Sequence, residues 1–296
     1  MAASLSFVPG CIMSDTSTLT ALPDPQDFAV LLARGLPGFG TVSWLDVTGS
    51  TNADVQQVLR GGAGDARAPI LHGSHAQQAG RGRAGRSWQA RAGDALLFSC
   101  GFRLGLPPAA LPPLAVAAGV AACEALNALL PAGAQRLRLK WPNDIQRGDA
   151  KLAGILTETV SAPAGEGRGS GVVLGIGINL RGARELSAAL GRDVADWAAT
   201  GGGADPVALV AAVAEAWRQA ADTFEVQGLA PFLPRFAAVD ALAGRTVAVT
   251  DDGRPLLAGT ASGIDAAGRL QLRNGQGLHT VTVGDVSVRS VEGGEQ

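Results

Sequence analysis

The sequence predicts an α+β fold, in which a large domain of helices on a mixed sheet is followed by a small all-β barrel. Strand-like and helix-like apolar segments alternate through the first 240 residues. After Gly244 the chain changes to short alternating segments separated by Asp-Asp-Gly, Ala-Gly and Asn-Gly turns, a pattern typical of a small barrel. The 296 residues also exceed one typical domain of about 100–200 residues. We therefore predict an N-terminal segment at 1–40, a large domain at 41–242 and a barrel at 243–296.

Composition indicates a globular, soluble protein. Hydrophobic residues make up 47% of the chain and charged residues 17%. The formal net charge of −2 argues against a general nucleic-acid binder, because such domains are normally basic. Cys11, Cys100 and Cys123 are odd in number and widely spaced, so we expect neither a disulfide framework nor a protein metal site. Since the N-terminus lacks a basic region and no apolar run approaches about 18 residues, we expect a cytoplasmic location.

Hydrophobic periodicity locates the elements of the large domain. Strands are expected at 41–47, 68–73, 96–102, 136–141, 151–158 and 171–180. Helices are expected at 28–33, 53–60, 114–130 and 206–224. The helix at 114–130 is apolar almost all round, so it should be buried. The barrel strands are expected at 245–250, 256–264, 269–273, 278–283 and 286–289.

The segment Gln77–Trp88 is the most densely charged part of the chain. It interleaves three glycines with three arginines, which indicates a loop that folds closely around an anion. The spacing Gly80-x-Gly82-x-x-Gly85 also matches a dinucleotide-binding fingerprint, but that fingerprint must open a helix. The residues that follow lack helical periodicity, so we reject it. A solvated basic loop is the alternative interpretation.

Other polar residues flank the predicted strands. Ser50, Thr51 and Asn52 are all good helix N-caps, yet one cap is sufficient, so polar groups are left over. The strands at 136–141, 151–158 and 171–180 are predicted to be adjacent. Together they would present Lys140, Asn143, Asp144, Lys151 and Asn179. A lysine that opens an apolar strand is usually a surface residue, which is the alternative for Lys151.

Five patterns in one order carry a family resemblance. They are Ser50-Thr51-Asn52, Gln77–Trp88, Lys140-Trp141-Pro142-Asn143-Asp144, Lys151–Leu156 and Gly175-Ile176-Gly177-Ile178-Asn179. Together they resemble the biotin protein ligase family, over about residues 41–290. The resemblance implies a catalytic domain related to class II aminoacyl-tRNA synthetases, followed by an SH3-like barrel.

The resemblance also implies an activity and its partners. Such ligases activate biotin with ATP and Mg²⁺ to biotinyl-5′-AMP, and then acylate a lysine of a biotin carboxyl carrier protein of acetyl-CoA carboxylase or a related carboxylase. Many bacterial relatives carry an N-terminal winged helix and act as repressors. About 40 mixed residues do not match such a segment, so we expect no DNA partner, and no membrane partner either. The position that is often arginine in relatives is Ala84 here, which weakens the positive field of the loop.

Site residues follow by matching motifs position by position. On the biotin side they are Ser50, Thr51, Asn52, Gln77, Arg81, Gly82, Arg83 and Lys151. On the adenylate side they are Arg83, Arg86, Trp88, Lys140, Asn143, Asn179 and Arg289. Arg83 and Lys151 are the expected catalytic pair, because a carboxylate and an α-phosphate can meet only between preorganised cations. No metal ligands are expected among the side chains.

Two other functions compete with this one. A lipoate or octanoate ligase or transferase shares the fold, but it would need a long apolar tunnel. Ser50, Thr51 and Gln77 instead suit the donors and acceptors of a ureido ring. A non-catalytic nucleic-acid-binding protein could use the three arginines on phosphates, but it should be basic elsewhere.

Overall fold

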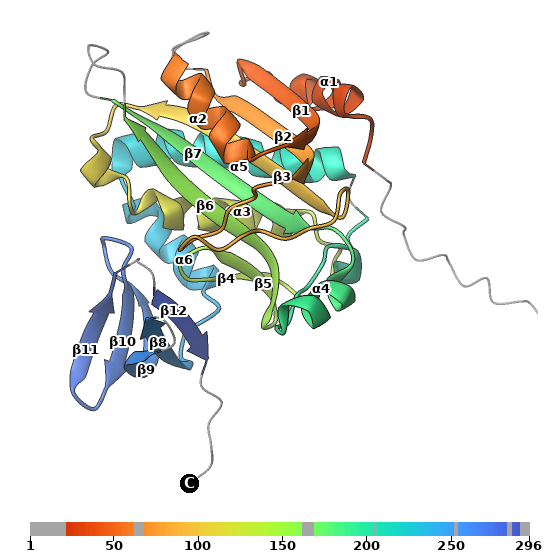
Figure 1. Cartoon of the computed structure of the whole chain (residues 1–296). Coiled ribbons are helices and arrows are strands. Elements are labelled where there is room, and N and C mark those ends of the chain that lie inside the picture. Colours follow the sequence, from red (N-terminus) through yellow and green to blue (C-terminus); the bar gives the residue numbers. More distant parts are fainter. Residues whose placement is uncertain are drawn as a thin grey trace, which may run out of the picture.

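The computed structural model describes residues 22–61, 68–161, 169–203, 205–251, 254–282 and 286–290. Its large sheet has seven strands in the order β1-β2-β3-β7-β6-β5-β4, and a second sheet has five (Figure 1). In the large sheet β1 runs parallel to β2, and the other neighbouring strands are antiparallel. The predicted mixed sheet with helices and the separate C-terminal β unit are therefore confirmed.

The predicted strands and helices of the large domain are all present. The strands are β1 (Thr41–Thr48), β2 (Ile70–Gln77), β3 (Ala95–Leu104), β4 (Leu137–Lys140), β5 (Asp144–Arg147), β6 (Ala150–Ser161) and β7 (Ser170–Asn179). The helices are α1 (Pro25–Gly35), α2 (Thr51–Gly61), α3 (Leu114–Ala128), α4 (Ala183–Leu190), α5 (Pro206–Gln227) and α6 (Leu233–Val239). Three of these, β5, α4 and α6, were not predicted, and β2 runs four residues beyond its predicted end.

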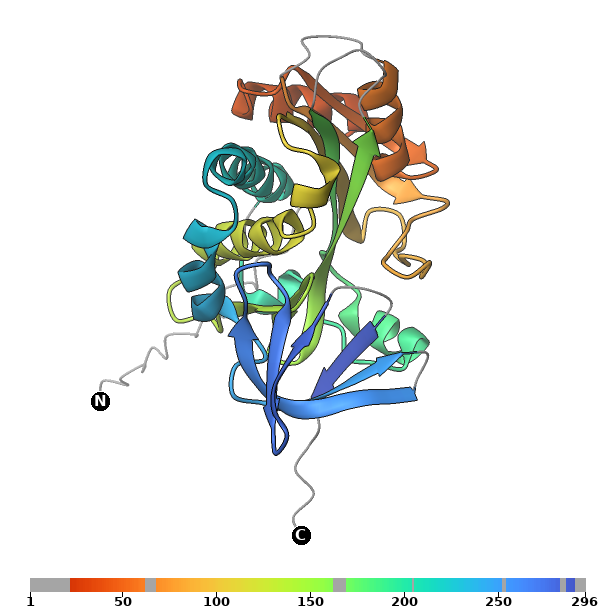
Figure 2. The same cartoon turned by 90° about the vertical axis from the view of Figure 1, so that its left-hand side faces the viewer.

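Helices cover both faces of the large sheet. The antiparallel pair α3 and α5 packs on one face, where Trp217 Nε1 donates to the carbonyl oxygen of Ala118 at 2.9 Å. The predicted burial of α3 is confirmed on all its sides. Helix α1 packs on β1 and α5 through the fully buried Phe28 and Leu32. Helix α2 lies on the opposite face, across β2, β3 and β7 (Figures 1 and 2). This opposite face carries the site described below.

The second sheet contains the five predicted strands. They are β8 (Thr246–Asp251), β9 (Arg254–Ile264), β10 (Leu270–Asn274), β11 (Gly277–Val281) and β12 (Val286–Ser290). All neighbours are antiparallel, in the order β11-β10-β9-β8-β12. The sheet lies below the large one, beside β4 (Figure 1).

A buried contact joins the two sheets. Trp141, at the end of β4, donates its indole N–H to the carbonyl oxygen of Gly268 at 2.9 Å. Gly268 lies in the turn between β9 and β10 with φ +75°, and a Cβ there would come within 3.3 Å of Leu229. Ala241 N–H also donates to the Leu139 carbonyl at 3.0 Å. The second sheet is thus anchored directly behind the residues that follow Trp141.

Of the three cysteines, two lie in the part of the chain that the structure describes. Cys100 and Cys123 are buried free thiols, whereas Cys11 lies outside the described residues. Among the described helices, none has the length and apolar character that crossing a bilayer would require.

Candidate functional site

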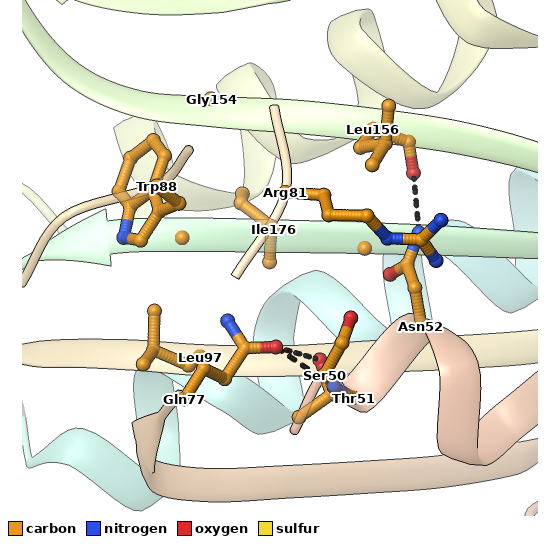
Figure 3. A pocket seen from close by; sticks show the side chains of 12 residues that line it. Ser50, Thr51, Asn52, Gln77, Arg81, Trp88, Leu97, Gly154, Leu156 and Ile176 are labelled. Atoms are coloured by element: carbon orange, nitrogen blue, oxygen red, sulfur yellow. Dashed lines mark hydrogen bonds between the residues drawn. The ribbon is translucent and has the colours of Figure 1, made fainter. Parts of the chain in front are cut away.

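A pocket opens beside the N-terminus of α2, above β6 and β7 (Figure 3). It contains about 320 Å³ of empty space, including its open mouth. The residues that line it are Ser50, Thr51, Asn52, Gln77, Arg81, Trp88, Leu97, Gly154, Leu156, Gly175, Ile176 and Gly177. Six of the predicted site residues, which are spread over 39 positions of the sequence from 50 to 88, therefore meet in one cavity.

Glycines make the floor of this pocket flat. A Cβ at Gly177 would lie 2.4 Å from Cε2 of Trp88, and one at Gly154 would lie 3.0 Å from Cζ3 of the same ring. A Cβ at Gly175 would lie 1.9 Å from Oδ1 of Asn52. The two glycines of the motif on β7 are thus required for Trp88 and Asn52 to lie against the strand.

Gly175→Ala is expected to destabilise the fold by about 1–3 kcal/mol, the usual cost of an added methyl group in a closely packed site. The new methyl displaces the buried amide of Asn52. Urea unfolding monitored by circular dichroism measures this change. Gly61→Ala is the matched control, because a Cβ there has no atom within 4 Å and the substitution should be neutral or slightly stabilising. Equal midpoints for the two variants would contradict the packing argument.

Gln77 and Thr51 form one polar wall of the pocket. The backbone N–H of Thr51 donates to Oε1 of Gln77 at 2.7 Å. This contact fixes the orientation of the amide, because a backbone N–H requires an acceptor. The NH₂ group of Gln77 consequently points into the pocket (Figure 3). Gln77 reaches this position because it ends β2 and is in register with Thr48 of β1. Thr48 in turn lies three residues before Thr51, the first residue of α2.

The amide of Asn52 is held by protein groups. Its Nδ2 donates to Oε2 of Glu158 at 2.7 Å and to the carbonyl of Leu156 at 3.4 Å, while its Oδ1 accepts from Ser99 Oγ at 2.6 Å. Arg81 donates to the same Glu158 oxygen at 3.2 Å. Sequence reasoning missed Ser99 and Glu158. A polar residue inside the apolar strand 96–102 was the available signal for Ser99, because buried hydroxyls require partners.

The predicted anion loop is a β-hairpin. An isolated bridge joins Arg81 to Ser87, and Arg86 N–H donates to the carbonyl of Arg83 at 3.2 Å to close the turn. Ala84 has φ 54° and the glycine after it has φ 68°. Two central residues with positive φ are what a type I′ turn over residues 83–86 requires. The alanine occupies a conformation that costs a non-glycine residue about 1–2 kcal/mol.

Cations gather at the end of the pocket beyond Trp88. Lys151 Nζ lies 2.6 Å from Oδ1 of Asp144 and 5.5 Å from the centroid of the Trp88 ring. Lys140 of β4 lies opposite Asp144 of β5 in the register of the two strands. Burial lowers the pKa of the Lys140 ammonium group, and the Asp144 carboxylate opposes that shift. The predicted cluster is thus assembled, but the prediction that its three strands are adjacent is wrong, because the unpredicted strand β5, which Asp144 opens, lies between β4 and β6.

Asn143 links the hairpin to this cluster. Its Oδ1 accepts from Nη1 of Arg83 at 3.4 Å, and its Nδ2 donates to the carbonyl of Ile155 at 2.6 Å. Ile155 N–H returns a bond to the Asn143 carbonyl at 3.0 Å. Arg86 lies further out, exposed to solvent, with Nε 3.4 Å from the Arg83 carbonyl oxygen.

A second pocket adjoins the first and shares Trp88 with it. It is lined by Ser87, Trp88, Gln89, Lys151, Asn179, Leu186, Leu190, Arg192 and Val194. Asn179 is buried there, and its Nδ2 donates to the carbonyls of Lys151 at 3.3 Å and Ala195 at 3.2 Å. Asn179 therefore holds the backbone of Lys151 in place. The site as a whole is a polar cavity, an aromatic partition and a cationic cavity in series.

Comparison with known proteins identifies this arrangement. Residues 51–179 match the model of the Biotin/lipoate A/B protein ligase family, and residues 243–289 match that of the Biotin protein ligase C terminal domain. The bifunctional ligase/repressor BirA of Escherichia coli (strain K12) is 33% identical over 271 residues, which are 90% of this chain and 81% of BirA. The chain belongs to the biotin protein ligase family.

Other biotin protein ligases agree with this assignment. The biotin–[acetyl-CoA-carboxylase] ligase of Paracoccus denitrificans is 34% identical over 248 residues, which are 81% of this chain and 97% of the relative. The structure of biotin protein ligase from Aquifex aeolicus in complex with biotin and ATP matches with a TM-score of 0.68. It covers 85% of this chain and 99% of its own, at 22% identity, so it supports the biotin ligase fold alone.

The predicted site residues differ in how close they lie to the two pockets. Eight of them line the two pockets: Ser50, Thr51, Asn52, Gln77, Arg81, Trp88, Lys151 and Asn179. Gly82 and Arg83 lie in the hairpin, Lys140 ends β4, and Asn143 lies in the turn between β4 and β5. Arg86 is exposed. Arg289 belongs to β12, but its side chain lies outside the described part of the chain.

Proposed function

We propose that this chain activates biotin with ATP to biotinyl-5′-AMP and transfers the biotin to a lysine of a biotin carboxyl carrier protein of acetyl-CoA carboxylase or a related carboxylase. The names of the relatives support this activity, and solved relatives hold biotin with ATP in Aquifex aeolicus and biotinylated ATP in Helicobacter pylori. The observation that carries the proposal is the pair of adjoining cavities. One offers hydrogen-bonding groups and the other offers cations, and Trp88 separates them.

The polar cavity is the proposed biotin site. A ureido ring needs a few placed donors and acceptors within a partly apolar slot. Ser50, Thr51 and Gln77 supply these groups, with Leu97 and Ile176 as the apolar part. We assign Asn52 to holding Thr51 through Ser99, because its own amide is bonded to protein groups. Arg81, Gly82 and Arg83 come from the hairpin and would cover the open side.

The cationic cavity is the proposed site of adenylation. A carboxylate oxygen of biotin attacks the α-phosphorus of ATP, and the bond to the leaving pyrophosphate breaks with its electron pair. Both reactants are anionic, so fixed positive charge lowers this barrier most. Lys151 and Arg83 are the proposed catalytic residues. Lys140, Asn143, Asn179, Arg86 and Arg289 complete the proposed adenylate side, and Trp88 would cover the nucleotide.

Transfer needs the intermediate to be kept from water. The amine of the acceptor lysine attacks the acyl carbon, AMP leaves, and the amine loses one proton. A closed hairpin over the ligand prevents hydrolysis before that amine arrives. The hairpin of residues 81–87 stands at the mouth of the pocket and is suited to this task.

Several finer assignments belong to the same proposal. Mg²⁺ would enter with the phosphates of ATP, since it usually keeps substrate phosphates and waters as ligands. The charged residues that line this cavity, Lys151 and Arg192, are both cationic, and Asp144 is paired with Lys151, so this set fits the phosphates. We further propose that the catalytic domain is class II aminoacyl-tRNA synthetase-like and that the C-terminal sheet is an SH3-like barrel. A cytoplasmic enzyme without a DNA or membrane partner is consistent with the net charge of −2.

ATP–pyrophosphate exchange tests the proposed function. Exchange is expected with biotin and not with lipoate or octanoate, because neither of these fatty acids has a ureido ring for Thr51 and Gln77. The three acids are assayed in parallel at equal concentration, with purified full-length protein. Equal exchange with lipoate and biotin would favour the lipoate ligase alternative.

A further inference from the structure

We propose that Glu158, which lies outside the ureido-binding wall, sets which groups of that wall donate and which accept hydrogen bonds. The inference rests on the proposed function, because it concerns how the biotin pocket recognises its ligand. Glu158 is a positioning residue in this scheme. It accepts hydrogen bonds from Asn52 of α2 and from Arg81 of the hairpin, and it acts on the pocket through Asn52 and then Ser99 of β3.

The side chains of Glu158, Asn52, Ser99 and Thr51 form a chain of hydrogen bonds, and the carboxylate of Glu158 sets the direction of donation along it. Ionised Glu158 and the carbonyl of Leu156 are both pure acceptors, so the side of Asn52 that faces them must be its NH₂ group. The carbonyl oxygen of Asn52 is thereby turned toward Ser99. At 2.6 Å, this oxygen must accept the single hydroxyl proton of Ser99. Ser99 can then only accept from its other neighbour.

Each hydroxyl group has one proton to donate, and this fixes the direction of the next hydrogen bond, at Thr51 in the pocket wall. Thr51 Oγ1 lies 2.7 Å from Ser99 Oγ and 3.2 Å from Oε1 of Gln77. Its one proton goes to Ser99, because the shorter contact cannot be left between two lone pairs and the Ser99 proton is already used. Toward the ligand, Thr51 therefore offers a lone pair. Gln77, held by the backbone of Thr51, offers its NH₂ group.

This pattern matches the two kinds of group on a ureido ring. An N–H of the ring meets the acceptor at Thr51, and the C=O of the ring meets the donor at Gln77. Without Glu158, only the 3.4 Å contact to Leu156 would resist rotation of the Asn52 amide. Rotation would reverse Ser99 and Thr51, and the ring N–H would then face a second donor. Recognition of the ureido ring thus depends on the Glu158 carboxylate, at the other end of the hydrogen-bond chain.

Three variants test the assignment through the KM for biotin in ATP–pyrophosphate exchange. Glu158→Leu is expected to raise this KM about 10- to 100-fold, the loss of a hydrogen bond to a charged group, while the KM for ATP is unchanged. Glu158→Gln keeps an acceptor for Asn52, so its KM should stay within about fivefold of the original. Ser99→Ala breaks the chain at the next link and should raise the KM about 3- to 10-fold.

The control is Glu225→Leu, the same substitution at an exposed carboxylate on α5, and it should change neither KM. Because leucine fills much of the space of glutamate, a packing role for Glu158 predicts that Leu and Gln behave alike, and that result overturns the inference. An unchanged biotin KM in Ser99→Ala also overturns it, and this variant decides the matter if Glu158→Leu does not fold. Failure of the unmutated protein to use biotin would instead count against the proposed function.

Discussion

Replacing Lys151 with glutamine is expected to slow the formation of biotinyl-5′-AMP about 100- to 1,000-fold, the usual effect of removing one preorganised electrostatic contact. The ammonium group lines the second cavity beside Trp88, the residue that both cavities share, and the proposed meeting point of the carboxylate and the α-phosphate is there. Its side chain is 17% exposed, so water screens its charge only in part. Glutamine can still donate to Asp144, but it brings no positive charge.

The control for Lys151→Gln is Asp144→Asn, which removes the same ion pair and leaves the lysine charged. A partly exposed pair contributes at most about 1 kcal/mol, so both variants should unfold within a few degrees of the original protein. Single-turnover adenylate formation should fall far more in the lysine variant. If folded Lys151→Gln formed the adenylate at the unmutated rate, the role of Lys151 would be confined to its pair with Asp144.

Local hydrophobic patterns in the sequence predict much of the fold. The strands with continuous apolar runs and the helix α3 were predicted because burial of that much apolar surface leaves few other arrangements. The elements that were missed are short. Strand β5 has four residues, and none of the eight residues of α4 is fully buried, so neither produces a periodic signal.

The motifs of the site were predictable from the sequence, and the ligand contacts of Asn52 and Asn179 stay predictions. What the sequence did not reveal is that both amides hold protein groups in the structure. Sequence does not reveal which carbonyls a fold leaves without partners, and asparagine satisfies them. The hairpin was also missed, because its central residues are Ala84 and a glycine in place of the Asn-Gly or Asp-Gly pair that usually marks a type I′ turn.

Arg83→Gly is expected to separate making the intermediate from keeping it. Truncating one partner of a buried charge pair costs about 2–5 kcal/mol, and the loss appears mainly in the off-rate. At about 1.4 kcal/mol per tenfold, biotinyl-5′-AMP should leave tens to thousands of times faster. Lys140, Lys151 and Arg86 remain, so activation should persist at a reduced rate.

The position of Arg83 explains this split. It is the first residue of the type I′ turn, and its guanidinium lies 3.4 Å from Oδ1 of Asn143. A charge-assisted bond to a phosphate is shorter and stronger than that contact, so a bound phosphate would be the favoured partner of the guanidinium. Arg83 would then connect the hairpin to the ligand, and its loss would free the hairpin to open.

The test must distinguish lost charge from a looser turn, and the neighbouring residue offers the control. Ala84→Gly adds backbone freedom at a position with φ 54°, where glycine is unstrained, and it removes no charge. Each variant is incubated with ATP, biotin and an unrelated lysine-rich protein, and free adenylate and biotin on the bystander are measured. Arg83→Gly should raise both, because an escaped acyl-adenylate reacts with any exposed amine, and Ala84→Gly should raise neither. Persistent activation by Arg83→Gly without either signal would show that another residue retains the intermediate, and equal leakage from both variants would assign retention to the stiffness of the turn.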